Sequence, residues 1–547
     1  MKILFPFLIL FIIAFSCKKD NKPAGNKDIS IDSVLINKIK AINNGSVGNI
    51  DFHNVLVKIN FSEKVDTTKF NKNKIFFTGN IDTAYSYRFG ADSKELLIRP
   101  RTQLKPLTTY RLLIDVGENL GVLISDGFSF TFSTLLDSTP KFPLISNDSL
   151  LTLVQKQTFK YFRDHAHPVS GLARERFGSG DVVTSGGSGF GLMAILVGIE
   201  RGFITRQQGF EHLQKIVNFL NNPATEKFHG AFPHWLNGTT GKAIAFSTKD
   251  NGGDLVETAY LIQGLLTVKQ YFLNGNASEK ALCDTIQKIW QNVEWTWYQK
   301  DNQNKLYWHW SSNYNWDMNM PVTGWNEALI VYVLAASSPT FPISKQVYDE
   351  GWARNGAIKN GKTFFGIQLP LGEDRGGPMF FAHYSFLGQD PRNLQDTYTK
   401  YWTQNVAHAR INYEYCKANP KNQKGYSDQF WGLTASDIKN GYTASSPNND
   451  VGVIAPTAAL SSFPYTPEES MKALKFFYYI LGDKLWGNYG FYDAVNLNDG
   501  WFANSYLAID QGPIICMIEN YRTQLLWNYF MNDKDIQSGL NKLGFTY

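Results

Sequence analysis

The period of the hydrophobic pattern changes once along this chain of 547 residues, and that change constrains the fold most strongly. In the first part, apolar and polar residues alternate in short runs, among them VLVKINF (55–61), ELLIRP (95–100) and FSFTFST (128–134). Alternation with period two, interrupted by turn-forming residues, is typical of a small β-sandwich. We therefore predict a β-sandwich over residues 29–135.

A linker with two prolines, residues 136–149, separates this part from a long helical part. No alternation of strands and helices follows it. Helices in succession without strands favour a mainly α fold, and we predict an (α/α)6 barrel over 150–547. Apolar residues recur at helical spacing in ten segments: 150–166, 189–202, 205–222, 254–273, 278–298, 326–338, 394–416, 455–463, 468–486 and 511–531.

The N-terminal sequence MKILFPFLILFIIAFSC has one early Lys, a short apolar run and small residues near its end. This pattern is typical of an export signal, and the run is short for a membrane-spanning helix. Its end resembles a bacterial lipobox, which predicts a lipid on Cys17, a tether over 18–28 and attachment to the outer membrane on either face. The alternative is an ordinary signal peptide in which Cys17 is incidental.

Composition describes a soluble globular protein, with 43% hydrophobic and 18% charged residues. The net charge of +5 is small for this length, and no dense Lys/Arg block indicates nucleic-acid binding. The aromatic share of 15% suits either stacking on sugar rings or a core rich in Phe and Trp. Apart from Cys17 there are three distant cysteines without a CxxC pair, which indicates buried free thiols and neither a disulfide framework nor a zinc site.

Three acids, Asp250, Asp254 and Glu257, begin the helical segment in STKDNGGDLVETAYLIQGLL (247–266). Residues at i and i+3 share one helix face, and crowded carboxylates raise one another's pKa. Such a group suits glycosidic bond hydrolysis, which needs one carboxyl to protonate the leaving oxygen and another to act as base or nucleophile. The alternative is that Asp254 and Glu257 only complement the positive end of the helix dipole. Spacing alone leaves both open.

Other segments carry weaker signals. Gly187, Gly189 and Gly191 stand ahead of a helical run without a preceding strong strand, so we predict a tight loop that brings the backbone close to a ligand or another helix, and not a dinucleotide site. His234 and Trp235 in AFPHW pair a hydrogen-bond donor with an aromatic platform, which suits a sugar or an ordinary structural histidine. Further candidate binding or acidic residues in similar company are Trp325 and Glu327 in GWNEA, Asp450 in NNDVG and Asp510 in AIDQGP.

Several long motifs in one order resemble a known family. They are TFKYFRDHAHPVSGLARERF, TSGGSGFGLMAILVGIERGFITR, KDNGGDLVETAYLIQGLL, GPMFFAHYSFLGQDPRNLQD and AIDQGPIICMIENYRTQLLW. Together they resemble the bacterial glucoamylase-like domain, and more narrowly the β-1,2-glucanases of glycoside hydrolase family 144, over about residues 150–540. The preceding sandwich resembles a bacterial Ig-like module, for which we expect a spacer or supporting role.

The resemblance implies an (α/α)6 barrel that cleaves linear β-1,2-glucan to sophorose-type oligosaccharides with inversion at the anomeric carbon. It implies Asp250, Asp254 and Glu257 as catalytic acids and Glu327 as a residue near the substrate. Because an inverting pair stands roughly 6.5–9.5 Å apart, we expect a pair more distant than Asp254 with Glu257. Candidates are Asp250 with Glu257, or either with Glu327.

We therefore expect an endo-acting β-1,2-glucanase that works as a monomer without metal or cofactor. The alternatives are an enzyme of the same fold that is exo-acting and releases sophorose or that cleaves another glucan, and a surface glycan-binding lipoprotein without catalysis.

Overall fold

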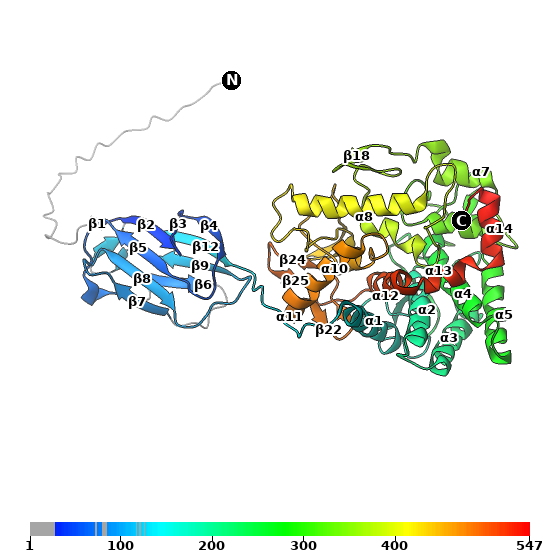
Figure 1. Cartoon of the computed structure of the whole chain (residues 1–547), viewed down its shortest axis with the longest axis horizontal. Coiled ribbons are helices and arrows are strands. Elements are labelled where there is room, and N and C mark those ends of the chain that lie inside the picture. The colour runs from blue at the N-terminus through cyan, green and yellow to red at the C-terminus, as the bar shows by residue number, and fades with distance from the viewer. Residues whose placement is uncertain (1–27, 72–73, 79–84, 116, 120–121, 125) are drawn as a thin grey trace, which may run out of the picture. The chain divides into compact units, whose positions relative to one another are not determined.

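The computed structural model describes residues 28–547 except 72–73, 79–84, 116, 120–121 and 125. The lipidation prediction at Cys17 lies outside the described residues. The chain divides into two compact units, with the boundary between Asp137 and Ser138. The first unit consists of strands and the second mainly of helices (Figure 1).

The first unit is a β-sandwich, as its alternating pattern predicts. One five-stranded sheet has the order β3-β2-β5-β8-β7, one four-stranded sheet has the order β4-β12-β9-β6, and a small sheet has the order β1-β11-β10. The strands are β1 (Asp28–Ile29), β2 (Ile31–Ile36), β3 (Ile39–Ala41), β4 (Gly45–Ile50), β5 (Val57–Phe61), β6 (Ile75–Thr78), β7 (Tyr85–Phe89), β8 (Glu95–Pro100), β9 (Thr109–Ile114), β10 (Gly117–Asn119), β11 (Val122–Ile124) and β12 (Phe128–Thr134).

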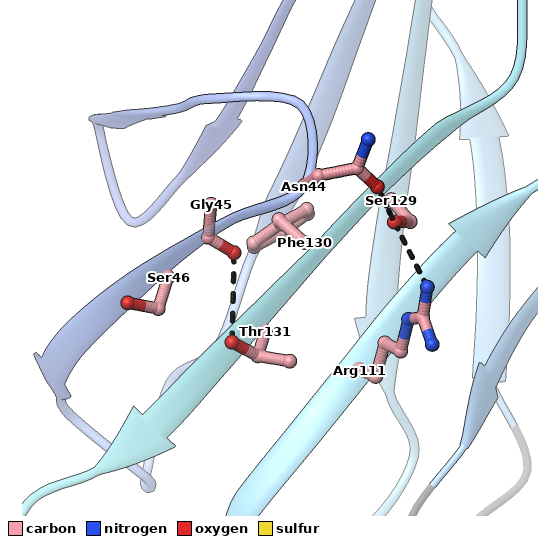
Figure 2. A pocket seen from close by; sticks show the side chains of 7 residues that line it. All are labelled: Asn44, Gly45, Ser46, Arg111, Ser129, Phe130 and Thr131. Carbon is pink, nitrogen blue, oxygen red and sulfur yellow. Dashed lines mark hydrogen bonds between the residues drawn. The ribbon is translucent and has the colours of Figure 1, made fainter.

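Alternate residues of these strands face one core, as in β5, where Val57, Ile59 and Phe61 are buried between half-buried neighbours. A cavity of about 380 Å³ lies on the β4–β12–β9 sheet (Figure 2). In it Ser129 donates to Asn44 at 2.8 Å and accepts from Arg111 at 3.2 Å, so its polar side chains bond one another. No carboxylate is among the residues that line it.

The second unit is an (α/α)6 barrel, built from six successive pairs of helical segments. The inner members are buried along almost their whole length, and they pack in the cyclic order α2, α4, α6, η6–η7, α9 and α12. His383 at the start of η7 bonds Ser462 after α9 at 3.0 Å, and α12 packs on α2, which closes the ring. The outer members α1, α3, α5, α8 and α10 each keep one exposed face, as amphipathic helices do.

The helices are α1 (Asn147–Arg163), α2 (Ser185–Glu200), α3 (Arg206–Asn221), α4 (Leu255–Phe272), α5 (Ala277–Gln291), α6 (Leu329–Ser337), α7 (Lys345–Val347), α8 (Tyr401–Ala418), α9 (Pro456–Leu460), α10 (Pro467–Lys475), α11 (Gly482–Leu485), α12 (Ala508–Thr523), α13 (Leu525–Met531) and α14 (Lys534–Leu543). Short 3-10 or π segments are η3 (Trp295–Gln299), η4 (Tyr348–Trp352), η5 (Arg354–Gly356), η6 (Met379–Ala382), η7 (Tyr384–Phe386) and η8 (Phe476–Ile480).

Short strands in the loops complete the unit: β13 (Val182–Thr184), β14 (Trp235–Asn237), β15 (Ala243–Ile244), β16 (Gly253–Asp254), β17 (His309–Trp310), β18 (Thr363–Phe364), β19 (Ile367–Gln368), β20 (Ala435–Ile438), β21 (Gly441–Ala444), β22 (Trp486–Gly487), β23 (Gly490–Phe491), β24 (Val495–Asn496) and β25 (Trp501–Phe502). The first and last helical pairs of the barrel meet, because α12 packs on α1 and α2 (Figure 1).

The prediction of a glycine loop ahead of a helix was wrong, because Gly187, Gly189 and Gly191 lie inside α2. Their role is close packing of two inner helices. A Cβ on Gly189 would stand 2.1 Å from the carbonyl oxygen of Tyr260, and one on Gly264 would stand 2.2 Å from the carbonyl oxygen of Gly189. Only glycine lets α2 and α4 approach this closely.

Three predicted helices are divided in the structure, and in one of them, 278–298, α5 ends at Gln291 before η3 begins at Trp295. The segment 511–531 breaks at Gln524, which has a left-handed φ of 62° between α12 and α13. The segment 468–486 passes through the π turn η8 between α10 and α11. Periodicity cannot find such breaks, because the apolar spacing continues across them.

Cys283, Cys416 and Cys516 are buried and free, which confirms the prediction for these three thiols. Among the described residues, no helix has the length and apolar character needed to cross a membrane.

Candidate active site

Asp254 is the N-cap of α4 and is fully buried. Its Oδ1 accepts from the backbone N–H groups of Val256 (3.0 Å) and Glu257 (2.9 Å). Its Oδ2 accepts from Nδ1 of His234 (3.1 Å) and from Nε1 of Trp308 (3.2 Å). The helix-start interpretation of Asp254 is therefore correct. The same carboxylate also accepts a hydrogen bond from His234, so the residue that caps α4 also positions a side chain of the site.

Glu257 lies in the first turn of α4 and reaches across to the N-terminus of α2. Its Oε2 accepts from the backbone N–H of Gly186 at 2.8 Å and from Oγ1 of Thr184 at 3.3 Å. A Cβ on Gly186 would stand 2.4 Å from that oxygen, so glycine is required there. Burial raises the pKa of Glu257. The positive charge of His234 lowers this pKa, and the negative charge of Asp254 raises it further.

Asp250 sits in the tight turn before α4, where its backbone pairs with Ser247. Its side chain is buried, and Oδ1 stands 3.3 Å from Nε2 of His309. That nitrogen accepts from the backbone N–H of Gly252 at 3.2 Å. Burial and the charge of Asp254 raise the pKa of Asp250 to about 7, against the attraction of His234. This carboxyl therefore keeps its proton to a higher pH than an exposed aspartate does.

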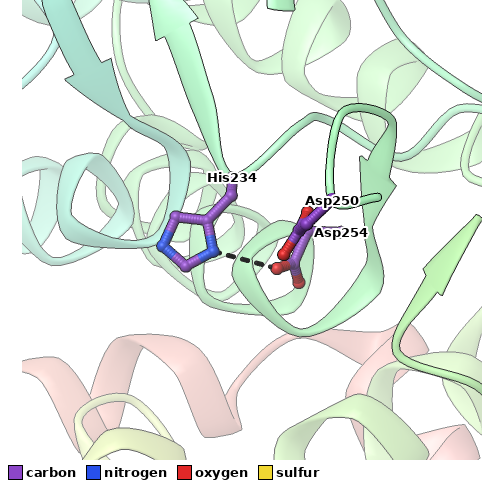
Figure 3. A group of neighbouring side chains, drawn as sticks. All are labelled: His234, Asp250 and Asp254. Carbon is purple, nitrogen blue, oxygen red and sulfur yellow. Dashed lines mark hydrogen bonds and ion pairs between the residues drawn. The ribbon is translucent and has the colours of Figure 1, made fainter. Parts of the chain in front are cut away.

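His234 stands among these acids (Figure 3). Strand β14 begins at the next residue and pairs with β13, so His234 lies beside the start of α2, where its carbonyl accepts from the N–H of Ser185 at 3.1 Å. Burial disfavours the imidazolium, but the charges of Glu257, Asp254 and Asp250 outweigh it and raise the pKa of His234 to about 9. At neutral pH the site therefore holds one fixed positive charge.

One atom each of His234, Asp250 and Asp254 lies within 4.8 Å of the others, which is the grouping that a metal site needs. However, Nδ1 of His234 carries a proton in its bond to Asp254, and a metal ligand needs a neutral imidazole. The imidazolium supplies the positive charge that a cation would bring. The two acids therefore suit a protonated His234 between them better than a bound metal ion. The expectation of a metal-free enzyme stays a prediction.

Aromatic rings border this group. Phe246 stacks on His234 with ring centroids 4.3 Å apart, and it meets Trp235 edge to face at 4.9 Å. The Phe246 side chain is half exposed, so part of the ring surface is accessible from solvent. Sequence reasoning missed Phe246, because a lone aromatic in a loop gives no signal. It also missed Trp308, whose indole N–H is brought to Asp254 only by the β16–β17 pairing.

Glu327 joins the group from a different segment, just before α6. Burial raises the pKa of Glu327 to about 7; a backbone hydrogen bond opposes this, and the negative charges of Glu257 and Asp254 add to it. The structure thus brings together Asp250, Asp254, Glu257, Glu327 and His234, as the sequence predicts.

Two other predicted binding residues are placed differently. Trp325 is buried in the core against Phe386 and Tyr401. Asp450 is buried, and its carboxylate accepts from the hydroxyls of Tyr426 (2.9 Å) and Tyr415 (3.1 Å). Both positions have structural partners, and their binding roles stay predictions.

Known proteins share this architecture and sequence. A family model described as "Putative glucoamylase" matches residues 319–534, and a bacterial Ig-like domain model matches residues 43–134. The exo β-1,2-glucooligosaccharide sophorohydrolase (non-reducing end) of Parabacteroides distasonis is 46% identical over 428 residues. The match covers 74% of this chain and 59% of that relative, less than two thirds of its length.

Among solved structures, the endo-β-1,2-glucanase of Chitinophaga pinensis, in complex with sophorotriose and glucose, is 55% identical with a TM-score of 0.72, over 74% of this chain and 99% of that one. A β-1,2-glucanase of P. distasonis is 37% identical with a TM-score of 0.71, over 95% and 74% of the two chains. The chain therefore belongs to the bacterial glucoamylase-like enzymes of glycoside hydrolase family 144, and it carries an N-terminal bacterial Ig-like domain.

Proposed function

We propose that this protein hydrolyses linear β-1,2-glucan to sophorose-type oligosaccharides, by carboxyl acid/base catalysis with inversion of the anomeric carbon. One observation carries the proposal: Glu327, from the loop before α6, shares an electrostatic environment with the acids at the start of α4, and its pKa is about 7. A carboxyl that keeps its proton near neutral pH is suited to protonate a leaving glycosidic oxygen.

Glu327 is our choice for the proton donor. Its side chain is half-buried, whereas Asp254 is fully buried and occupied by the helix cap and by His234. The negative charges of Glu257 and Asp254 help to keep Glu327 protonated, which assigns these two acids a supporting role. Asp250, with its similar pKa, is the alternative donor.

Asp250 and Asp254 do not suit an inverting pair. Their oxygens group within 4.8 Å of one another and of His234. An inverting pair needs roughly 6.5–9.5 Å, so that a water molecule fits beside the sugar. Glu327 from another segment therefore suits one half of the pair better, and Asp250 with Glu257 is the alternative pair.

Two relatives favour different modes of attack. The C. pinensis enzyme is an endo-β-1,2-glucanase, and the P. distasonis relative is an exo-acting sophorohydrolase. We propose endo action, supported by the higher identity of 55% to the former. A time course on long β-1,2-glucan separates the two modes: mixed oligosaccharides appear early with endo action, whereas sophorose alone appears throughout with exo action.

The activity itself is tested by reducing-end release from a panel of β-1,2-, β-1,3-, β-1,4- and β-1,6-glucans, with ¹H NMR of the newly formed anomer. We expect release from the β-1,2-glucan only, and α-anomers first. Glycan binding without new reducing ends would favour the rival, a catalytically silent binding lipoprotein. Initial β-anomers would contradict inversion.

We also propose export and a lipid anchor on Cys17, which the lipobox-like sequence motivates. In bacteria fed a labelled fatty acid, we expect label on the protein and loss of that label in the Cys17→Ala variant. An unlabelled wild-type protein that is secreted freely would contradict the anchor.

A further inference from the structure

A second pair of carboxyl groups, Asp493 and Asp510, lies outside the group around His234. Asp510 is in the first turn of α12, and Asp493 is in the loop between β23 and β24. Their exposed fractions are 2% and 3%. Both carboxyl oxygens of Asp510, and Oδ1 of Asp493, find no hydrogen-bond donor in the described chain outside the pair, within which a shared proton joins the two carboxyls. Burial of carboxyl oxygens without partners is costly, so the oxygens that the shared proton does not join are available for water or a substrate hydroxyl.

The remaining oxygen of Asp493 is fixed. It accepts from the backbone N–H of Asp437 in β20 at 2.7 Å. The Asp437 carboxylate in turn accepts from Arg176 at 3.2 Å and from the hydroxyl of Ser505 at 2.6 Å. The positive charge of Arg176 therefore goes mainly to Asp437 and Glu175, and the Asp493–Asp510 pair keeps its like-charge crowding.

Tyr384 connects this pair to the candidate active site. Burial raises the pKa of its phenol, and so do Asp510 and Glu327, so both acids lie within electrostatic reach of one hydroxyl. The Tyr384 ring packs edge to face on Tyr260 of α4, at 5.7 Å, one turn from Glu257. Two inner helices, α12 and α4, thus present acids to the same region from different segments.

An inverting reaction needs a base that is distinct from and distant from the donor. The acids at the start of α4 are crowded around His234, and Asp254 is occupied by its cap. We propose that the Asp493–Asp510 pair is the catalytic base of the hydrolysis, with Asp510 contacting the attacking water and Asp493 as the positioning residue that shares its proton. This inference rests on the proposed function.

The water oxygen forms a bond to the anomeric carbon while the glycosidic C–O bond breaks. The leaving oxygen takes the proton of Glu327, and the water gives its proton to Asp510. The pair then holds two protons in place of one, and exchange with solvent restores both acids.

The charged and titratable groups that face the pair are Asp437, Arg176, Tyr384 and the half-exposed Tyr442. Burial raises the pKa of both members, Asp493 to about 7, and each carboxyl opposes ionisation of the other. Such a pair titrates as a unit. It can take a proton from water only in the form that holds one proton, so the form that holds two protons is inactive. Activity should therefore rise with pH on its acid side, near pH 7.

The test uses the full chain with four variants. Asp510→Asn should lower kcat about 10²- to 10⁴-fold with KM within about three-fold, because the group acts on water and not on sugar binding. Asp510→Ala in azide should regain turnover and yield an α-glycosyl azide, since azide enters at the position of the water. Asp499→Asn, the same change at an exposed position in the loop after β24, should behave as the wild type.

Asp493→Asn supplies a measurement that a purely structural role would not change. In the working state Asp493 shares its proton with the Asp510 carboxylate, and an amide is a weaker donor, so the variant stabilises that carboxylate less and the acid limb of the pH profile should move to higher pH. An unmoved limb overturns the proposal, and so does Asp510→Asn with more than a tenth of wild-type kcat and a native melting temperature. A wild-type protein that releases no reducing ends from β-1,2-glucan would instead contradict the proposed function.

Discussion

The backbone N–H of Gly186 donates a hydrogen bond to Oε2 of Glu257 at 2.8 Å, across the contact between the N-terminal turns of α2 and α4. The bond exists only because residue 186 has no side chain: a Cβ there would stand 2.4 Å from the same oxygen. The glycine-rich start of α2 thereby holds an acid of the neighbouring helix. One close contact between inner helices serves both packing and the site.

Gly186→Ala should displace Glu257 and lower kcat at least about ten-fold, because the carboxylate loses its fixed donor and the charges around His234 are rearranged. The measurement is steady-state hydrolysis of β-1,2-glucan, together with thermal melting. Gly202→Ala is the control, because Gly202 follows α2 and no atom of the described residues lies near the position of an added Cβ. The φ of Gly202 is 67°, so this control also carries backbone strain. Activity of Gly186→Ala equal to that of the control would contradict the role of this contact.

Glu327→Gln should lower kcat about 10²- to 10⁴-fold, since an amide cannot give a proton to the leaving oxygen. In the wild type, Glu327 acts only while protonated, so activity should fall as pH rises through about 7. A pH profile of kcat measures this alkaline limb. A substrate with a good leaving group, such as an aryl sophoroside, should restore much of the variant's rate. Unchanged dependence on the leaving group would identify Asp250 as the better donor.

Stability should depend on pH through His234. Its folded-state pKa of about 9 exceeds the ordinary value of 6.5, so the folded state binds the proton more tightly than the unfolded state. This contribution is complete below pH 6.5 and is lost as pH rises towards 9. Melting temperatures of the wild type and His234→Gln should therefore differ most at low pH and converge near pH 9. A difference that stays constant over this range would contradict a charged His234.

Phe246→Ala should raise KM about ten-fold with little change in kcat, because the half-exposed ring offers a stacking surface and does not touch the reacting carboxyls. Initial rates over a range of sophorooligosaccharide concentrations separate the two constants. Phe365→Ala, which removes a similarly exposed ring at the β18–β19 turn, is the control and should leave KM unchanged. Equal effects of the two variants would show that Phe246 does not stack on substrate.

Much of the fold follows from local patterns. The sandwich is predicted by alternation in strands such as β5 and β12, and the all-α barrel by helical spacing after residue 150. Both predictions work because the spacing of buried side chains depends on the conformation of the local segment. The acids at 250, 254 and 257 stand out for the same reason: they are neighbours in sequence, and one helix start brings them together.

The groups that each acid contacts depend on the tertiary structure alone. It assigned Asp254 to a helix cap, bound Glu257 to Gly186, 71 residues away, and placed Glu327 and His234 in the same electrostatic group. It also revealed the Asp493–Asp510 pair, whose members approach through the β20–β25 loops and α12. No sequence pattern reports such contacts, because pKa values and hydrogen-bond partners depend on burial and on segments that meet only when the barrel closes.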